Sequence, residues 1–294
     1  MNRILAIVFV VAGCGAAVVN HPGAANAQLS LAADAQMVVI PAGRFVSGST
    51  PEERAAAYDD YQTSSGQDAA RTNKWFDGED DRHVMTLPAF RIDLMPVTQA
   101  QYGEFVAAGK APAPSIDEAT WKAQGFTQDY ASQVVRFNWT DGRPPSGRED
   151  HPVVLVTWTE ATSYCKWRGE LRGEPRRLPT AAEYEKAERG DGGLAYPWCN
   201  TFEADKLDSA VNGPHDTVPV GQYTTGASQY GVLGMAGNVF AWTSTPFAGN
   251  KMTVKGSAWD DWAGVGRGAS RHGRPITTRH VIIGFRCAAD APVL

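Results

Sequence analysis

The chain has 294 residues, of which 43% are hydrophobic and 10% aromatic, enough to bury a substantial core in one large domain or two fused halves. Its formal net charge is -5. The absence of a basic run after the first residues argues against nucleic acid or an anionic membrane surface as the principal partner. A neutral or cationic small molecule, or another protein, fits this charge better.

The first 27 residues have the pattern of a signal peptide. A positive start, MNR, precedes an apolar run over residues 4–19, and residues 25–27 (ANA) give the small-x-small pattern of a cleavage site. The apolar run is too short for a stable membrane span, so no transmembrane segment is expected in the mature chain. We expect cleavage after Ala27 and a periplasmic or secreted chain. The alternative is a lipoprotein anchored at Cys14, in the lipobox-like VAGC.

Capping signals predict the starts of three short helices. Thr98, Thr157 and Thr180 each stand three residues before a Glu or Gln, which is the capping-box pattern. Glycines that follow are expected to end these helices: Gly109, Gly169 and Gly190. A further helical pattern covers residues 51–61.

The rest of the chain is rich in glycine and proline, with short runs typical of strands. These runs are VVLV at residues 153–156, TVPV at 217–220 and VIIGFR at 281–286. We therefore predict an α+β fold with short helices, small antiparallel sheets and much irregular loop. We assign residues 28–294 to a single domain. Within it, residues 51–81 and 112–148 are interpreted as surface insertions, which serve as ordinary decoration or build a substrate lid or partner surface.

Three cysteines remain after the signal peptide: Cys165, Cys199 and Cys287. An odd number in a compartment that permits disulfides predicts one pair and one leftover thiol. Sequence alone leaves the pairing open. Cys199, in YPWCN, is interpreted as a small residue filling a turn, and it is a weak nucleophile candidate because no base stands beside it.

Ordered motifs along the chain carry a family resemblance. They are MVVIPAGRFVSGS, PAFRIDLMPVTQAQYGEFV, HPVVLVTW, RRLPTAAEYEKAERG, YPW, TVPVG, GVLGMAGNVFAW and IIGFRC. This series resembles the formylglycine-generating enzyme (sulfatase-modifying factor) family over nearly the whole exported chain. The resemblance implies a C-type-lectin-like scaffold and a disulfide between Cys165 and Cys287. It also implies that a second bridge of the animal enzymes is absent, because its positions are Glu188 and Gly268.

The copper site of this family is expected to be missing. The copper enzymes hold copper(I) between two thiolates and oxidise a cysteine of a client sulfatase, since this ion prefers soft sulfur ligands. Here the region reads KGSAWDDWAGVGRGASR. The alignment places Asp260 at the first thiolate and residues 263–265 at the second. Copper-dependent oxidation of a sulfatase cysteine is therefore not expected.

One calcium site of the family is also expected to be lost. Gly234 and Ala241 stand where the family has side-chain oxygen donors, and calcium requires hard oxygen ligands. A second family calcium site falls in the region of Asp208, and its position stays open.

The residues that replace the thiolates are the candidate site. Asp260 and Asp261 could act as a base or bind a cation, and Ser257 matches the pocket serine of the family. The flanking tryptophans and the following basic residues would bind and orient an anionic or planar substrate: Trp259, Trp262, Arg267, Arg271 and His272. The alternative is a solvated loop whose acids pair with those arginines. His272 and His280 lack a recognised metal-ligand spacing, so no metal site is predicted.

These observations lead to two hypotheses. The first is an exported maturation factor, an oxidoreductase acting on a small-molecule or peptide-derived substrate. The exported pyoverdine-maturation branch of the family, required to oxidise a siderophore chromophore in the periplasm, is the resembling case. The second is a non-catalytic binding or assembly module that serves a periplasmic partner such as a nitrite reductase. The sulfoxide synthase branch is disfavoured because this chain lacks the iron-binding bundle of those enzymes.

Overall fold

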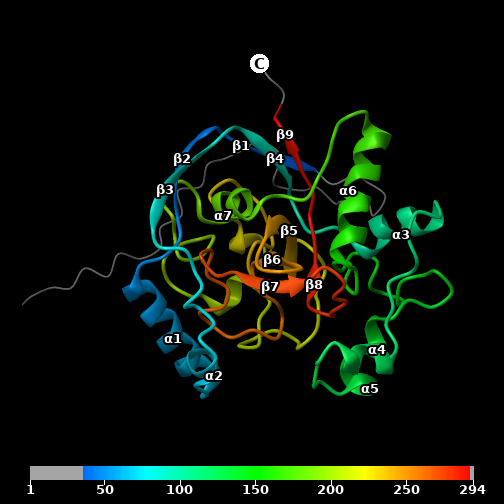
Figure 1. Ribbon diagram of the computed structural model, residues 1–294, viewed down its shortest axis with the longest axis horizontal. Helices are drawn as coiled ribbons and strands as arrows, with labels where there is room; N and C mark the ends of the chain where they lie inside the picture. The colour runs from blue at the N-terminus through cyan, green and yellow to red at the C-terminus, as the bar shows by residue number, and fades with distance from the viewer. Residues whose placement is uncertain (1–35, 292–294) are drawn as a thin grey trace, which may run out of the picture.

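The computed structural model describes residues 36–291, so the signal-like segment and Cys14 lie outside the described residues. One of its three small sheets lies near the centre of the view in Figure 1, the other two lie along its upper and left edge, and helices and long loops surround them. In the described part of the chain, no helix combines the length and apolar character needed to cross a membrane. The mixed architecture of short helices and small sheets confirms the predicted fold class.

The sheets join distant parts of the chain. The first has the order β1-β4-β9, with β1(Met37–Ile40), β4(Phe90–Asp93) and β9(Ala288–Asp290) antiparallel. The second is the antiparallel pair of β2(Gly43–Ser47) and β3(His83–Leu87), between which the helical segment at 51–81 stands in the chain. The third has the order β7-β6-β5-β8, with β7(His272–Pro275), β6(Lys251–Lys255), β5(Phe240–Pro246) and β8(Ile283–Gly284). Its β5 and β8 pair in parallel, and its other pairs are antiparallel.

The three predicted helix starts are confirmed. The helices are α3(Gln99–Ala107), α6(Trp158–Arg172) and α7(Ala181–Arg189), and each has both halves of its capping box. The predicted stop at Gly169 is wrong, because α6 continues to a left-handed Gly173. Gly169 has a different role: a Cβ there would lie 2.4 Å from the Glu174 carbonyl oxygen, so the chain passes too close for a side chain.

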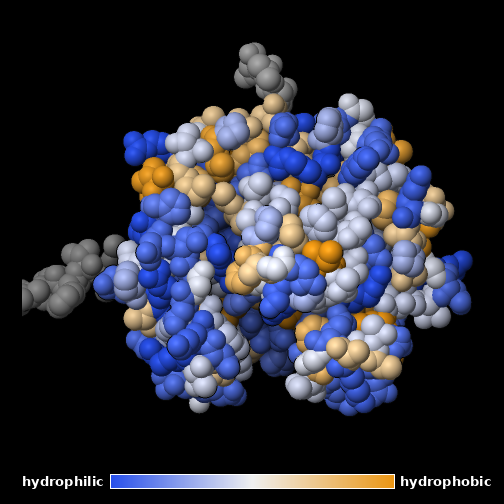
Figure 2. Space-filling view, in the orientation of Figure 1, coloured by the Kyte–Doolittle hydropathy of each residue, from blue (hydrophilic) through white to orange (hydrophobic). Residues whose placement is uncertain are grey.

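The two segments interpreted as insertions contain short helices. Residues 51–81 form α1(Pro51–Ser65), which confirms the helical pattern, and α2(Ala69–Thr72). Residues 112–148 form α4(Glu118–Ala123), α5(Tyr130–Gln133) and the 3-10 turn η1(Val135–Phe137). Further 3-10 turns are η2(Ala204–Lys206) and η3(Thr224–Gly226). The two helical groups form separate lobes at the lower edge of Figure 1, and the space-filling view in Figure 2 shows a hollow between them.

Two predicted strands are wrong. Residues 153–156 and 217–220 join no sheet, and Leu155, with a φ of 60°, interrupts the first run. Their backbone groups instead bond to separate loops: the Val153 N–H donates to the Val97 carbonyl, and the Val220 N–H to the Asp150 carbonyl. The apolar side chains at 153–156 are fully buried. The hydrophobic character of this run therefore reflects burial in the core and not pairing with a neighbouring strand.

The predicted disulfide joins Cys165 on α6 to Cys287 just before β9 and spans 122 residues of sequence. Beside it, the buried Phe285 packs edge-on against Tyr164, with ring centroids 5.3 Å apart. The pairing implied by the family resemblance is therefore confirmed, and it ties α6 to the last strand inside the core.

Cys199 is not a free thiol. It lies in a turn where its sulfur accepts a hydrogen bond from the Thr201 N–H at 3.3 Å. Residues 36–291 contain no free cysteine. The predicted leftover thiol refers to a mature chain without residues 1–27, which lie outside the described residues, so it stays a prediction.

Helix α7 is buried along most of its length despite its charge. Its side chains from position 183 to 189 are all buried. The Glu188 carboxylate has no hydrogen-bond partner, and burial raises its pKa to about 8, so the group is neutral at lower pH. The stem of Arg189 and the Glu188 carboxyl lie against Gly268, where a Cβ would be 2.2 Å from Arg189 Cγ. The two positions of the missing animal bridge are thus neighbours here, packed without sulfur.

Removal of the Cys165–Cys287 bridge should lower the free energy of unfolding by about 4 to 5 kcal/mol, because the bond constrains a long loop in the unfolded chain. The measurement is urea unfolding of the Cys165→Ala/Cys287→Ala variant against the native protein. A loss below about 1 kcal/mol would contradict the assignment of the bridge as a main constraint.

Glu188 should make the protein less stable as pH rises. Its folded pKa is above its ordinary value, so the native state binds more protons than the unfolded state between about pH 4.5 and 8, and stability falls across this window. The Glu188→Gln variant should show a shallower fall in the free energy of unfolding. The matched control is Glu170→Gln on the exposed side of α6, which should keep the native slope.

Candidate functional site

The loop that follows β6 is fixed in place by backbone contacts. The Trp259 N–H donates to the Asn238 carbonyl at 3.0 Å, and the Ala210 N–H donates to the Asp261 carbonyl at 2.9 Å. The buried Ser257 hydroxyl accepts the Gly237 N–H at 2.8 Å. Ser257 therefore holds this loop against the turn at 237–238.

Asp260 and Asp261 form a half-buried pair of carboxylates. An Asp261 oxygen accepts the Ala258 N–H at 2.8 Å, whereas Asp260 Oδ1 is buried without a hydrogen-bond partner. Burial raises the pKa of Asp260 to about 6. Burial, and then the neighbouring Asp260 charge, raise the pKa of Asp261 well above its ordinary value. Burial and the repulsion between the two carboxylates therefore favour retention of a proton by the pair, which suits a group that takes part in proton transfer.

Arg274 on β7 acts on both carboxylates. Its charge opposes the rise in their pKa values, and burial lowers the pKa of Arg274 itself. No ion pair joins Arg274 to either acid among residues 36–291. Arg274 is therefore a nearby counter-charge that leaves the acids available to another partner.

Both helical lobes contribute aromatic side chains to this site. From α1, the buried Tyr61 has its pKa raised by burial and by the charge of Asp261. From the other lobe, Phe137 stacks on Trp259 at a centroid distance of 6.3 Å, and the Arg136 guanidinium lies 5.6 Å from the same indole. The pair thus lies where the two insertions meet the central loop.

Trp259 also leaves a donor unused. Its side chain is 7% exposed, and its Nε1 is buried without a hydrogen-bond partner. Asp260 Oδ1 is an unused acceptor in the adjacent residue. Trp262 is half-buried and packs against the hydrophobic core cluster to which Trp259 belongs. Unsatisfied buried polar atoms are rare, so a donor and an acceptor in consecutive residues indicate a place for a polar ligand or water.

The predicted basic residues are engaged elsewhere. Arg267 is buried in an ion pair with Glu79, and Arg271 pairs with Asp80. His272 packs edge-on against Phe240, and burial lowers its pKa to about 3, so the ring is neutral. These contacts connect the loop to the lobe at 51–81 and to the central sheet.

The family's copper does not fit the residues present. Asp260 stands at one thiolate position, and Ala263 and Val265, at the other, are 4% and 1% exposed and packed inside the protein. Neither position carries a sulfur atom, and copper(I) requires soft ligands. Among the described residues, no group of three or more His, Cys, Asp or Glu is arranged to hold a metal ion.

The calcium loop also lacks its donors. Gly234 has no side chain, and its carbonyl accepts a hydrogen bond from Arg286 at 2.7 Å. Ala241 is buried in β5. The same Arg286 guanidinium donates to the Leu233 carbonyl at 2.8 Å and the Asp93 carbonyl at 3.0 Å. A buried guanidinium therefore binds the carbonyl that opens the former calcium loop.

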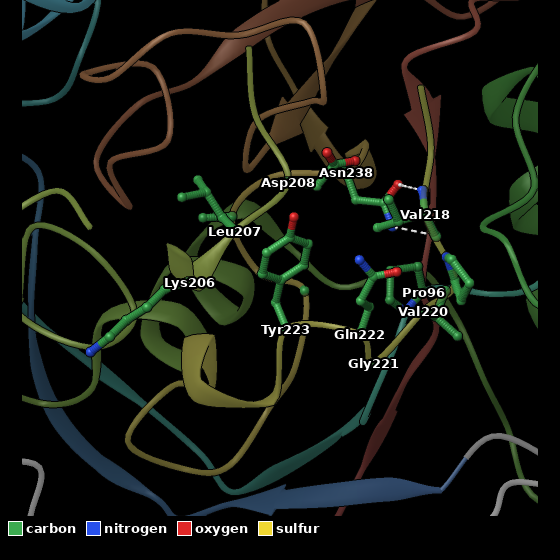
Figure 3. A pocket seen from close by; sticks show the side chains of 13 residues that line it. Pro96, Lys206, Leu207, Asp208, Val218, Val220, Gly221, Gln222, Tyr223 and Asn238 are labelled. Atoms are coloured by element: carbon green, nitrogen blue, oxygen red, sulfur yellow. Dashed lines mark hydrogen bonds between the residues drawn. The ribbon is translucent and has the colours of Figure 1, made fainter. Parts of the chain in front are cut away.

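Asp208 lines a small separate pocket (Figure 3). Its two carboxylate oxygens are buried without hydrogen-bond partners, and burial raises its pKa to about 7. Tyr223 stands across the pocket, and Asn238 is hydrogen-bonded to the Val218 backbone. The cavity volume of about 20 Å³ accommodates a single water molecule and no larger ligand.

Sequence reasoning missed Tyr61, and it counted Arg274 among the basic residues after the loop without selecting it for the site. Tyr61 lies on a helix that the sequence predicted, but no local pattern indicates that this helix packs over the loop at 260. Arg274 lies in the basic stretch after the loop, and only the position of β7 shows that it, and not Arg267 or Arg271, acts on the carboxylates.

Comparison with known proteins agrees with this architecture. The model of the sulfatase-modifying factor enzyme 1-like domain matches residues 24–291. The inactive C-alpha-formylglycine-generating enzyme 2 of Mus musculus is 32% identical over 90% of this chain and 89% of its own length. Hercynine oxygenase of Mycolicibacterium smegmatis is 29% identical over 76% of this chain and 58% of its own length.

A solved structure has the same fold. PvdO from Pseudomonas aeruginosa superposes with a TM-score of 0.61 and 22% identity, covering 87% of this chain and 94% of that one. The fold, the disulfide and the extent of the matching domain agree with one another. The chain belongs to the sulfatase-modifying factor, or formylglycine-generating enzyme, family.

Proposed function

We propose that the chain is an oxidoreductase that acts on a small-molecule or peptide-derived substrate, with the Asp260–Asp261 pair as proton acceptor. The observation that carries this proposal is the pair itself: two adjacent half-buried carboxylates, one with an unused oxygen, beneath aromatic side chains from two insertions. A relative named as an oxygenase supports oxidative chemistry in this family.

The proposed reaction is a two-electron dehydrogenation. The substrate loses two electrons and two protons. Dioxygen, the proposed acceptor, takes up the two electrons and the two protons and leaves as hydrogen peroxide. The carboxylate pair removes a proton from the substrate and passes it to the reduced oxygen. A base with a raised pKa suits this step, because proton transfer is most efficient when the pKa lies near the working pH.

The surrounding residues have supporting roles in this proposal. Ser257 fixes the loop that carries the acids. Tyr61 and Trp262 form the walls of the space that the substrate would occupy. Trp259 offers its free indole N–H to a polar group of the substrate. Arg267, Arg271 and His272 orient substrate indirectly, by holding the loop and the lobe at 51–81 together.

We further propose that the chain is exported, cleaved after Ala27, and works in the periplasm or outside the cell. The Cys165–Cys287 bridge supports this, since structural disulfides persist in oxidising compartments. Lipidation at Cys14 is the alternative. A pyoverdine-like siderophore chromophore is one substrate of the proposed kind.

A non-catalytic binding or assembly module, serving a periplasmic partner such as a nitrite reductase, is the second candidate. The mouse relative, 32% identical over most of both chains, is named as inactive. In this case the hollow between the lobes would hold a partner segment without reaction, and the acids would contribute only to binding.

Replacement of either acid should abolish the proposed reaction while leaving the fold intact. Asp260→Asn and Asp261→Asn should each lower the rate by about a hundredfold or more, the range for loss of a general base. The measurement is complementation of a deletion strain, with circular dichroism as the folding control and Asp205→Asn on η2 as the matched variant. Folded variants that still complement the deletion strain fully would contradict the catalytic proposal.

The rate should also depend on pH through the same pair. The base form requires a deprotonated carboxylate, and the pKa of Asp260 is raised to about 6. The rate should therefore rise as pH increases through about 6 and fall in more acidic solution. Oxygen uptake in the presence of substrate measures this profile, and a rate unchanged between pH 5 and 7 would contradict the assignment.

A further inference from the structure

A second cleft shares no lining residue with the pocket at Asp208. Its volume is about 640 Å³, within the range of ligand-binding pockets. It opens between the β2–β3 pair, the start of α7 and the ends of β5 and β6. None of residues 257–262 lines it, so it is distinct from the carboxylate pair.

The floor of this cleft carries a cation with an unused donor. Lys255 is 1% exposed and lines the cleft. Its ammonium donates to the Gly268 carbonyl at 2.6 Å and lies 3.4 Å from a Glu185 oxygen. An ammonium has three N–H groups, so one has no acceptor among the described residues.

The charges around this floor do not balance. The Glu185 carboxylate also pairs with Arg189 at 2.7 Å, so one acid serves two buried cations. Glu188, beside them, is neutral at near-neutral pH because burial raises its pKa to about 8. Lys255, Arg189 and Glu185 together therefore carry one positive charge, although the residues that line the cleft include as many acids as bases, and a buried positive charge favours a ligand of the opposite sign.

A second cation lines the wall of the cleft. Arg271 pairs with Asp80, yet its Nε is buried without a hydrogen-bond partner. The guanidinium also lies 5.3 Å from the Phe247 ring, which limits its movement. Lys255 and Arg271 thus both line one cleft, and each has a donor to spare.

We propose that this cleft binds the carboxylate of an organic ligand, either a small carboxylic acid or the C-terminus of a peptide. Lys255 and Arg271 would each donate to the carboxylate. A singly charged group fits better than a phosphate, because Asp80 and Asp81 also line the cleft and would repel a dianion. The volume accommodates a ligand of a few residues.

The test uses N-acetyl-trialanine with a free C-terminal carboxylate, and the same peptide with a C-terminal amide, titrated by calorimetry into the full chain. We expect the acid to bind and the amide to bind at least about tenfold more weakly, as for loss of a charge-assisted hydrogen bond. Competition with benzoate distinguishes a site for small carboxylic acids from a site for the C-terminus of a peptide. Displacement of the peptide by benzoate shows that a small acid suffices, and failure to displace assigns the site to a peptide end.

Two variants locate the site. Arg271→Gln and Lys255→Met should each weaken binding of the acid by about tenfold or more. Arg91→Gln, which removes a surface ion pair with Glu174, is the matched control and should bind as the native protein does. If Lys255→Met fails to fold by circular dichroism, Arg271→Gln decides alone. Equal affinity for acid and amide, no binding of either probe, or native affinity in Arg271→Gln would overturn the proposal. None of these outcomes depends on whether the Asp260–Asp261 pair is catalytic.

Discussion

Helix α7 carries five charged side chains into the interior, and the domain is built so that most of them find partners. Buried charges are costly unless they are paired or hydrogen-bonded. Glu183 bonds Arg177, and Glu185 bonds Arg189 and Lys255. Lys186 donates to the Pro41 carbonyl, between β1 and β2. These bonds fix the entry to β2, the end of β6 and the last strand around one helix. Glu188 has no partner and is accommodated as a neutral group.

The same residues explain how far the sequence could predict the fold. Capping boxes are local, so Thr98, Thr157 and Thr180 marked the helix starts correctly. The disulfide followed from the family resemblance and not from spacing. The strand predicted at 153–156 failed because periodicity reports burial, and the backbone partners of that run come from loops that no local pattern identifies. Gly169 was misread because a glycine needed for close packing looks identical to one that ends a helix.

The candidate site was predictable in chemistry but not in surroundings. Asp260 and Asp261 could be found because they replace residues of known role, yet their raised pKa values arise from burial beneath two insertions. The sequence shows where Tyr61 and Phe137 are, but only the fold brings α1 and η1 to opposite sides of one loop. Arg267 illustrates the converse: it is close to the acids in sequence, and its partner Glu79 holds it in a structural role.

The segment from Gly264 to Arg271 connects the carboxylate pair to the second cleft. Glu79 and Asp80, adjacent on the first insertion, bind Arg267 and Arg271, and Gly264 passes so close to the Ala57 carbonyl that a Cβ there would lie 2.4 Å from its oxygen. The Gly268 carbonyl, between the two arginines, accepts the Lys255 ammonium. A ligand on Lys255 and Arg271 would therefore contact the same segment that holds the first insertion over Asp261. Movement of that segment would break the buried Arg267–Glu79 pair, so the second cleft and the carboxylate pair depend on the same fixed stretch of backbone.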